Sequence, residues 1–216
     1  MMAKPAVRGE TRELTGPAGT LEALLEGPED NPRAIGVVCH PHPLHEGSMH
    51  NKVVHSLARS FSRAGARTVR FNFRGVGASE GTFDEARGET EDALAVIEWL
   101  RSEVPDRPLW LAGFSFGAQV ALQAAPRARP AALVTVAPPV ARFGDNGPEE
   151  PACPWLLVQG DADEVVDPDS VHAWAGSRRR PPQVASVADT GHFFHRRLSE
   201  LQKHVSAFLE SIEKGD

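Results

Sequence analysis

Short apolar segments and longer amphipathic segments alternate along most of the chain. The short segments are almost uniformly apolar, which is typical of strands buried on both faces of a sheet. The longer segments repeat their apolar residues at helical spacing, which predicts helices with one buried face. The predicted strands are 35–39, 68–73, 109–112, 132–136, 155–158 and 184–187, and the predicted helices are 51–64, 86–103, 116–125 and 195–213. This alternation predicts an α/β fold with a mostly parallel, twisted sheet flanked by helices.

Two weaker strand candidates precede this pattern. Residues 10–14 and 21–26 flank Gly16-Pro17-Ala18-Gly19, and turn residues between two apolar runs predict a hairpin. The complete sheet is then expected to hold about seven to eight strands. With 216 residues, 41% of them hydrophobic, we expect one domain spanning 1–216. Only about 15 residues separate Pro139 from Trp155, which leaves no room for a lid domain.

The charge distribution excludes some classes of partner. The formal net charge is −6, and the one basic run, Arg178 to Arg180, precedes two prolines and reads as a solvated loop. Nucleic acid and membrane surfaces are therefore not expected partners. The first 14 residues are rich in charge and lack the apolar core of a secretory signal, and no apolar run reaches the length of a membrane span. Two cysteines, Cys39 and Cys153, are too few for a disulfide framework, so we expect a cytoplasmic protein.

The strongest chemical motif is Gly113-Phe114-Ser115-Phe116-Gly117, which matches G-x-S-x-G. It lies between a predicted strand and a predicted helix, where a sharp turn would present the Ser115 hydroxyl clear of the backbone. Glycines two positions away on each side make room for such a strained turn. Ser115 is therefore the candidate nucleophile, and the N–H groups that open the next helix would face a developing oxyanion.

A serine nucleophile needs a general base and an acid that orients the base. His192 follows Gly191 after the last predicted strand, which places it at the same sheet edge as Ser115, with His195 as second choice. Acids follow the strand that ends near Val158. Asp167 is better suited to cap a helix and Glu164 is expected to point away, but spacing alone does not choose between Asp161 and Asp163.

Taken together, the motifs resemble those of the α/β-hydrolase superfamily, and more narrowly its small, lidless bacterial branch related to dienelactone hydrolases and CocE-type esterases. The resemblance spans about residues 35–208. It rests on the strand-turn-helix motif Gly113-Phe114-Ser115-Phe116-Gly117, here called the elbow, together with His40-Pro41-His42-Pro43, residues 71–81, Gly160-Asp161-Ala162-Asp163 and Gly191-His192-Phe193-Phe194. In this superfamily the acid is usually the third residue after the strand-ending glycine, which implies Asp163. The histidine usually follows a glycine, which implies His192.

Acyl transfer also needs two N–H donors for the oxyanion. One is expected from Phe116. For the other, Pro41 and Pro43 have no N–H, which leaves His42 and Leu44, and the resemblance favours His42. The chain departs from the family pattern at Glu46, where a glycine is common. The cluster His40, His42, His45 and His50 lacks a carboxylate partner and a helical pair of ligands, so neither a metal nor another cofactor is expected.

The expected activity is hydrolysis of small or short-acyl carboxylic esters through a Ser-His-Asp triad and an acyl-enzyme, with a small-molecule ester as the partner. A thioesterase or an amide hydrolase would use the same residues. A catalytically silent binding scaffold is the alternative from a different functional class, since a fold does not guarantee a function.

Overall fold

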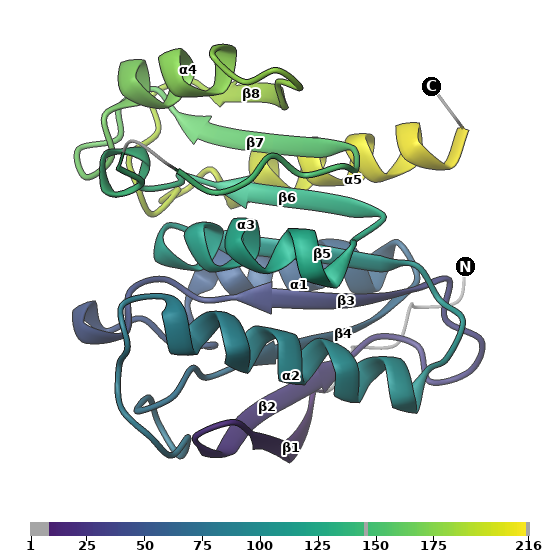
Figure 1. Cartoon of the computed structure of the whole chain (residues 1–216). Helices are drawn as coiled ribbons and strands as arrows, with labels where there is room; N and C mark the ends of the chain where they lie inside the picture. The colour runs from purple at the N-terminus through teal and green to yellow at the C-terminus, as the bar shows by residue number, and fades with distance from the viewer. Residues whose placement is uncertain (1–8, 145–146, 215–216) are drawn as a thin grey trace.

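The computed structural model describes residues 9–144 and 147–214, and its strands form one eight-stranded sheet in the order β1-β2-β4-β3-β5-β6-β7-β8 (Figure 1). The β1–β2 and β2–β4 pairs are antiparallel and all other pairs are parallel, which confirms the mostly parallel sheet and the N-terminal hairpin. Residues 1–8 of the charged N-terminal segment lie outside the described residues. The strands are β1 Glu10–Gly16, β2 Gly19–Glu26, β3 Ala34–Cys39, β4 Ala66–Phe71, β5 Leu109–Phe114, β6 Ala132–Val136, β7 Trp155–Gly160 and β8 Gln183–Val187.

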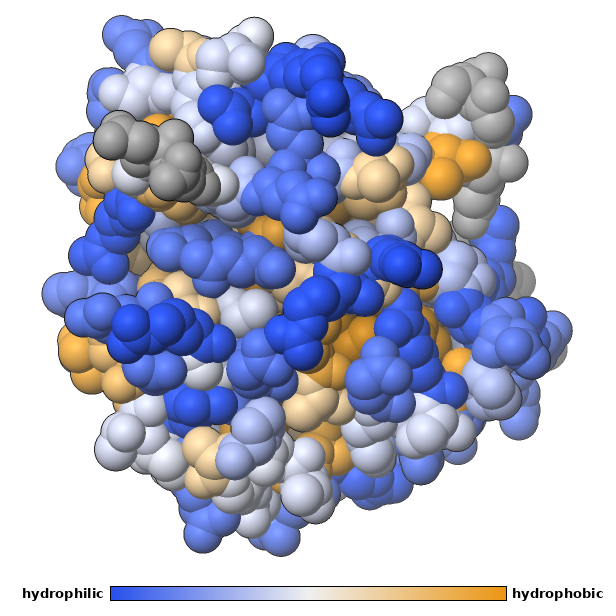
Figure 2. Space-filling model, in the orientation of Figure 1, coloured by the Kyte–Doolittle hydropathy of each residue, from blue (hydrophilic) through white to orange (hydrophobic). Residues whose placement is uncertain are grey.

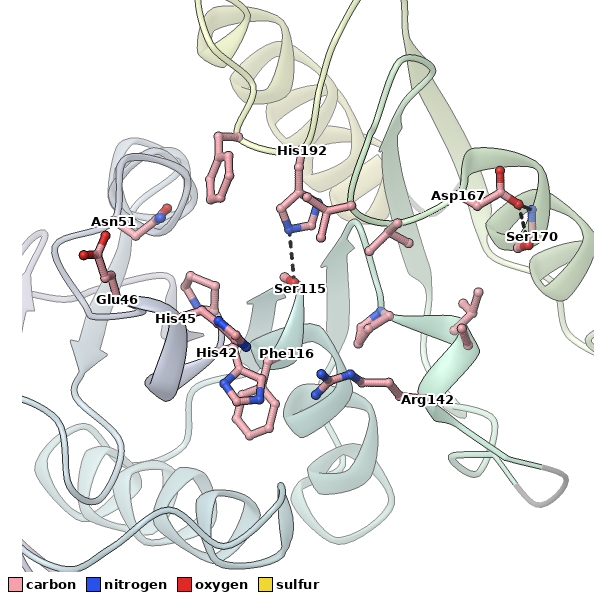
Figure 3. A pocket seen from close by; sticks show the side chains of 17 residues that line it. His42, His45, Glu46, Asn51, Ser115, Phe116, Arg142, Asp167, Ser170 and His192 are labelled. Atoms are coloured by element: carbon pink, nitrogen blue, oxygen red, sulfur yellow. Dashed lines mark hydrogen bonds between the residues drawn. The ribbon is translucent and has the colours of Figure 1, made fainter.

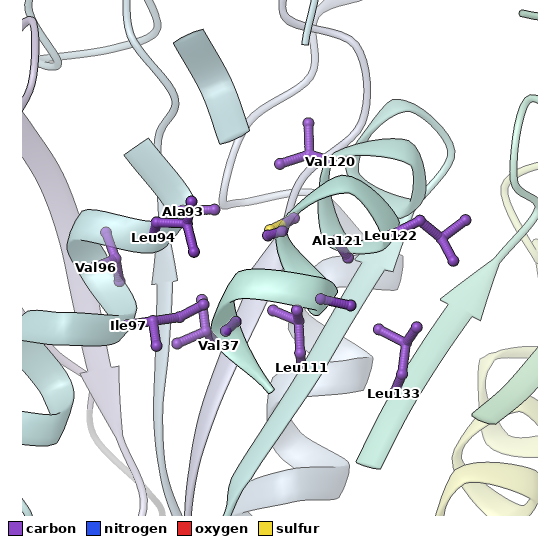
Figure 4. Close-up of a cluster of buried hydrophobic side chains, with 14 of the residues drawn as sticks. Val37, Ala93, Leu94, Val96, Ile97, Leu111, Val120, Ala121, Leu122 and Leu133 are labelled. Atoms are coloured by element: carbon purple, nitrogen blue, oxygen red, sulfur yellow. The ribbon is translucent and has the colours of Figure 1, made fainter. Parts of the chain in front are cut away.

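Helices cover both faces of the sheet, because the central strands β3, β5, β6 and β7 carry apolar residues on both sides. Val37 and Leu111 belong to the core on the side of α2, α3 and α4 (Figure 4), whereas their neighbours Val38 and Ala112 belong to the core on the side of α1 and α5. The bounds are α1 Lys52–Arg63, α2 Arg87–Glu103, α3 Phe116–Ala128, α4 Pro168–Gly176 and α5 Leu198–Lys214, with 3₁₀ turns η1 Pro43–His45 and η2 Val140–Arg142.

The helices turn their polar residues to solvent. Figure 2 shows that the face carrying α2 and α3 is mainly hydrophilic, with apolar residues confined to small patches. Of the helices in the described part of the chain, none is both long and apolar enough to cross a membrane.

Helix α3 is longer than predicted. We expected it to stop before Pro126, but it continues to Ala128. A proline removes only its own N–H bond and crowds the preceding turn, so one further turn remains possible near a helix end. The N–H of Arg129 donates to the carbonyl of Ala125 at 2.8 Å, and the left-handed backbone of Arg129, with φ 48°, then ends the helix.

Helix α5 begins later than predicted, at Leu198 and not at His195. Phe194 and Arg196 both have positive φ, 52° and 62°, which is incompatible with a right-handed helix. The Phe194 side chain is fully buried, so this irregular segment is anchored to the core. The Phe194 N–H also donates to the carbonyl of Gly191 at 3.1 Å, so the anchored segment includes residue 192.

The parallel strands all end at the same edge of the sheet (Figure 1). The connections that leave β3, β5, β6, β7 and β8 therefore meet there, although they are far apart in sequence. In sheets of this kind, ligands bind in the crevice outside the carboxyl ends of the strands.

Candidate active site

Ser115 occupies a strained turn between β5 and α3. Its φ and ψ are 54° and −119°, a combination that is rare for a residue with a side chain. The turn is held on both sides, because the Ser115 N–H donates to the carbonyl of Val136 at 2.8 Å and the Ser115 carbonyl accepts from Ala118 at 2.8 Å. Such strain costs about 1–3 kcal/mol and persists only where the surrounding structure enforces it.

The two glycines of the motif allow the turn to pack closely. A Cβ on Gly113 would lie 2.0 Å from the carbonyl oxygen of Gly117. A Cβ on Gly117 would lie 2.3 Å from the carbonyl oxygen of Cys39 and 2.5 Å from that of His40. The elbow thus sits directly against the end of β3, which brings the loop after β3 next to Ser115.

His192 reaches Ser115 from the segment between β8 and α5. Its Nε2 lies 3.1 Å from the Ser115 Oγ (Figure 3), and its Nδ1 lies 2.8 Å from the Asp163 Oδ2. A carboxylate only accepts hydrogen bonds, so Nδ1 carries the proton and Nε2 is left to accept from the hydroxyl. The imidazole packs against the rings of Phe114 and Phe193 at centroid distances of 4.9 and 5.1 Å.

Asp163 is the carboxylate that meets His192, whereas Asp161 is exposed. Both oxygens of Asp163 are occupied, and its side chain is fully buried. Oδ1 accepts from the N–H groups of Val165 and Val166 at 2.9 and 2.8 Å, and Oδ2 accepts from the Gln159 amide at 3.0 Å as well as from His192.

These contacts keep Asp163 ionised. Burial raises the pKa of Asp163, but the hydrogen bonds from His192 and from the N–H groups of Val166 and Val165 outweigh it and hold the pKa below its ordinary value. A negative charge at this place would stabilise an imidazolium on the neighbouring ring.

Glu164 behaves differently from the expectation that it points away. Its Oε2 accepts from the main-chain N–H of His192 at 3.3 Å. The contact joins the loop after β7 to the loop after β8. Glu164 is therefore a second carboxylate that holds His192 in place, through its backbone.

Phe116 and His42, the two expected main-chain donors to an oxyanion, both line the pocket that contains Ser115. Phe116 opens α3, and the first N–H groups of a helix have no acceptor within the helix. His42 lines the same pocket as Ser115 and Phe116. The N–H of Leu44 already donates to the Nδ1 of His42 at 3.2 Å, and the Leu44 side chain is exposed outside that pocket. These contacts favour His42 over Leu44 as the second candidate donor to an oxyanion.

His40 has a structural role between two segments. Its Nδ1 donates to the Pro41 carbonyl at 2.6 Å and its Nε2 accepts from the Phe73 N–H at 3.0 Å, so both ring nitrogens are engaged. Within residues 9–144 and 147–214, His, Cys, Asp and Glu side chains form no group of three or more that could hold a metal ion. Burial also raises the pKa of the Cys39 thiol, which keeps this buried strand-end cysteine protonated.

The buried His40 predicts a loss of stability in mild acid. Burial lowers its pKa to about 3, although the bond to Pro41 raises it. Between that pH and an ordinary histidine pKa of about 6.5, the unfolded chain binds a proton that the folded chain does not, so the free energy of unfolding falls as the pH falls. We expect this residue to contribute a loss of about 2 kcal/mol between pH 7 and pH 5.

Urea unfolding of the wild type and of His40→Gln at both pH values measures this contribution. Glutamine retains an oxygen for the Phe73 N–H but does not titrate. The pH-dependent loss should shrink in His40→Gln and persist in His50→Gln, since His50 is exposed. An equal loss in His40→Gln and in the wild type would contradict the assignment.

A pocket of about 700 Å³ contains Ser115 and His192. One wall is formed by Pro139 and η2, a second by the loop after β7, and a third by the histidine-rich loop after β3. Most of its surface is apolar, and ionisable side chains stand at intervals around it (Figure 3). The lining residues are Pro41, His42, His45, Glu46, Asn51, Ser115, Phe116, Pro139, Val140, Ala141, Arg142, Val165, Val166, Asp167, Ser170, His192 and Phe193.

Sequence reasoning missed three residues of this site. Gln159 is the second-last residue of β7, and Glu164 is one of the four acids that follow this strand. Arg142 stands in the connection after β6, at the sheet edge that carries Ser115. Position after a parallel strand is the signal that identifies Arg142, because all such connections converge on this edge.

Comparison with known proteins agrees with this architecture. A family model described as the alpha/beta hydrolase fold matches residues 44–151. The chain resembles a structure from Xanthomonas campestris, described as a serine hydrolase without a lid, at 43% identity and a TM-score of 0.89, covering 94% of each chain. It resembles a serine hydrolase homologue from Coxiella burnetii at 43% identity and a TM-score of 0.87, covering 92% of this chain and 96% of that one.

An uncharacterized protein of Rickettsia prowazekii is 33% identical over 215 residues, which cover 94% of this chain and 89% of that protein. Matches of this identity extend over nearly the whole chain, and the eight-stranded sheet with helices on both faces accompanies them. This chain is therefore a member of the α/β-hydrolase superfamily.

Proposed function

We propose that this protein is a serine carboxylesterase that cleaves small or short-acyl carboxylic esters. The observation that carries the proposal is the continuous hydrogen-bonded chain from Ser115 through His192 to Asp163, with its serine end open to the pocket. A hydroxyl is a weak nucleophile at neutral pH and needs an adjacent base to take its proton.

In the first step the Ser115 Oγ attacks the ester carbonyl carbon while the Nε2 of His192 takes the hydroxyl proton. The carbonyl oxygen becomes an oxyanion, which accepts hydrogen bonds from the N–H groups of Phe116 and His42. Asp163 stabilises the imidazolium that results. Preorganised donors of this kind stabilise the transition state more than the ground state, which is the condition for a higher rate.

The tetrahedral intermediate then expels the alcohol. His192 returns its proton to the leaving oxygen, and the carbon–oxygen bond breaks to leave an acyl group on Ser115. Water next attacks this acyl-enzyme, with His192 acting again as base, and releases the acid and the free serine.

The form of the pocket supports a small substrate. Its lining includes short apolar side chains such as Val140 and Val166, and η2 lies near the start of the connection between β6 and β7. We expect a compact acyl group to pack against such walls.

Two measurements test the proposal. A fluorophosphonate probe should label the wild-type protein, and mass spectrometry of the digest should place the adduct on Ser115. A panel of 4-nitrophenyl acetate, butyrate and octanoate, an acyl-coenzyme A thioester and an aminoacyl anilide should then show the highest kcat/KM for the short esters. Preference for the thioester or the anilide would replace the esterase assignment, and absence of both labelling and turnover would indicate a silent binding scaffold.

A further inference from the structure

Arg142, an exposed residue, places a positive charge on the wall of the pocket. It ends η2, lines the pocket, and points its guanidinium toward His42 and Phe116, below Ser115 (Figure 3). No residue in the described ranges forms an ion pair with this guanidinium. A cation that faces an apolar-lined pocket without a protein carboxylate is available for an anionic group on a ligand.

His42 adds a second donor on the same side. Its Nδ1 accepts from the Leu44 N–H at 3.2 Å, so the ring proton is on Nε2. Burial, together with the nearby charges of Arg142 and His45, lowers the pKa of His42 and keeps the ring neutral. The ring orientation is held by Phe83 and Phe116, with centroids 4.9 and 5.0 Å away.

The acidic residues of the pocket lie elsewhere. Asp167 turns its carboxylate to the start of α4, where Oδ2 accepts from the Ser170 N–H at 2.9 Å. Glu46 lies beside Asn51, on the other side of Ser115 from Arg142 (Figure 3). The pocket thus has a positive end beside Arg142 and negative groups away from it.

We propose that the Arg142 guanidinium and the Nε2–H of His42 form a subsite for an anionic oxygen group on the substrate, a carboxylate or a phosphate. The inference rests on the proposed esterase function and narrows its substrate class to small esters that carry such a group. The bond that is cleaved does not change. The subsite binds and orients the ester, so its effect should appear mainly in KM.

Matched substrates test the preference. On the alcohol side, 4-carboxyphenyl acetate and 4-phosphonooxyphenyl acetate are compared with neutral 4-methoxycarbonylphenyl acetate. On the acyl side, mono-(4-nitrophenyl) succinate is compared with its methyl ester. Hydrogen bonds to charged groups correspond to roughly tenfold or more in affinity, so at least one anionic ester should exceed its neutral partner about tenfold in kcat/KM. The carboxylate and phosphate arms distinguish the two anions.

Variants assign the preference to Arg142. Arg142→Gln should reduce the ratio between anionic and neutral esters to about one, and Arg142→Lys should retain part of it because the charge remains without the planar fork. Arg59→Gln is the matched control, since Arg59 is exposed on α1 outside the pocket and its replacement removes the same charge. The ratio should be unchanged in that control. A wild type that hydrolyses neutral and anionic esters equally well overturns the inference and leaves the esterase function intact.

A binding measurement separates failure of the subsite from failure of the chemistry. Calorimetry with 4-carboxyphenyl acetate and 4-phosphonooxyphenyl acetate on Ser115→Ala and on Ser115→Ala/Arg142→Gln needs no turnover. At least one anion should bind Ser115→Ala about tenfold more tightly than it binds the double variant. Equal affinities in both proteins for both anions overturn the subsite, whatever the activity of the wild type.

Discussion

Replacing Ser115 by alanine is expected to lower kcat for a short 4-nitrophenyl ester by about five to six orders of magnitude. The variant loses the atom that attacks the carbonyl, and His192 is left without the hydroxyl to which it is bonded at 3.1 Å. The oxyanion donors of Phe116 and His42 remain and sustain a small residual rate with water as nucleophile. Stopped assays over hours at high enzyme concentration measure that residual rate.

The matched control is Ser102→Ala, because Ser102 is exposed on α2 and lies outside the pocket. It should retain wild-type kcat. Circular dichroism and a thermal melt should show that Ser115→Ala is folded. Retention of more than about a hundredth of wild-type activity in folded Ser115→Ala would place the nucleophile elsewhere.

Replacing Asp163 by asparagine is expected to lower kcat by about four orders of magnitude. The asparagine oxygen can take the place of Oδ1, which accepts from Val165 and Val166, and its amide then faces the Nδ1 of His192. An amide donates at that position, so the imidazole proton moves to Nε2. His192 then presents a proton to Ser115 and cannot accept one.

The same change also has a structural cost. The Gln159 amide, 3.0 Å from Oδ2 of Asp163, would face a donor in place of an acceptor, which costs about 1–3 kcal/mol. A thermal melt separates this loss from the loss of turnover. Asp161→Asn is the control, and it should keep wild-type kcat because Asp161 is exposed. If Asp161→Asn loses activity and Asp163→Asn does not, the acid that orients His192 is Asp161 and not Asp163.

The order of helices and strands follows from local sequence patterns. Periodicity within each segment identified every strand and all the long helices, because neighbouring residues decide which face of an element is apolar. Boundaries were less certain where the backbone departs from regular geometry. Helix α5 begins three residues later than predicted. The side chain of Phe194 is buried in the core, and Phe194 and Arg196 have positive φ values that a right-handed helix does not allow.

The amino-acid sequence by itself determined the sheet, the elbow and the side chains that end up at one edge, since a strand, a tight turn and a helix are encoded by adjacent residues. Local sequence did not separate Asp163 from Asp161, although the family resemblance implied Asp163. The contact of Glu164 with His192 and the position of Arg142 in the pocket were decided only by the tertiary structure. These features depend on where loops from different strands meet. A carboxylate two residues from another has the same local context, and only packing buries one beside an imidazole 29 positions away and leaves the other in solvent.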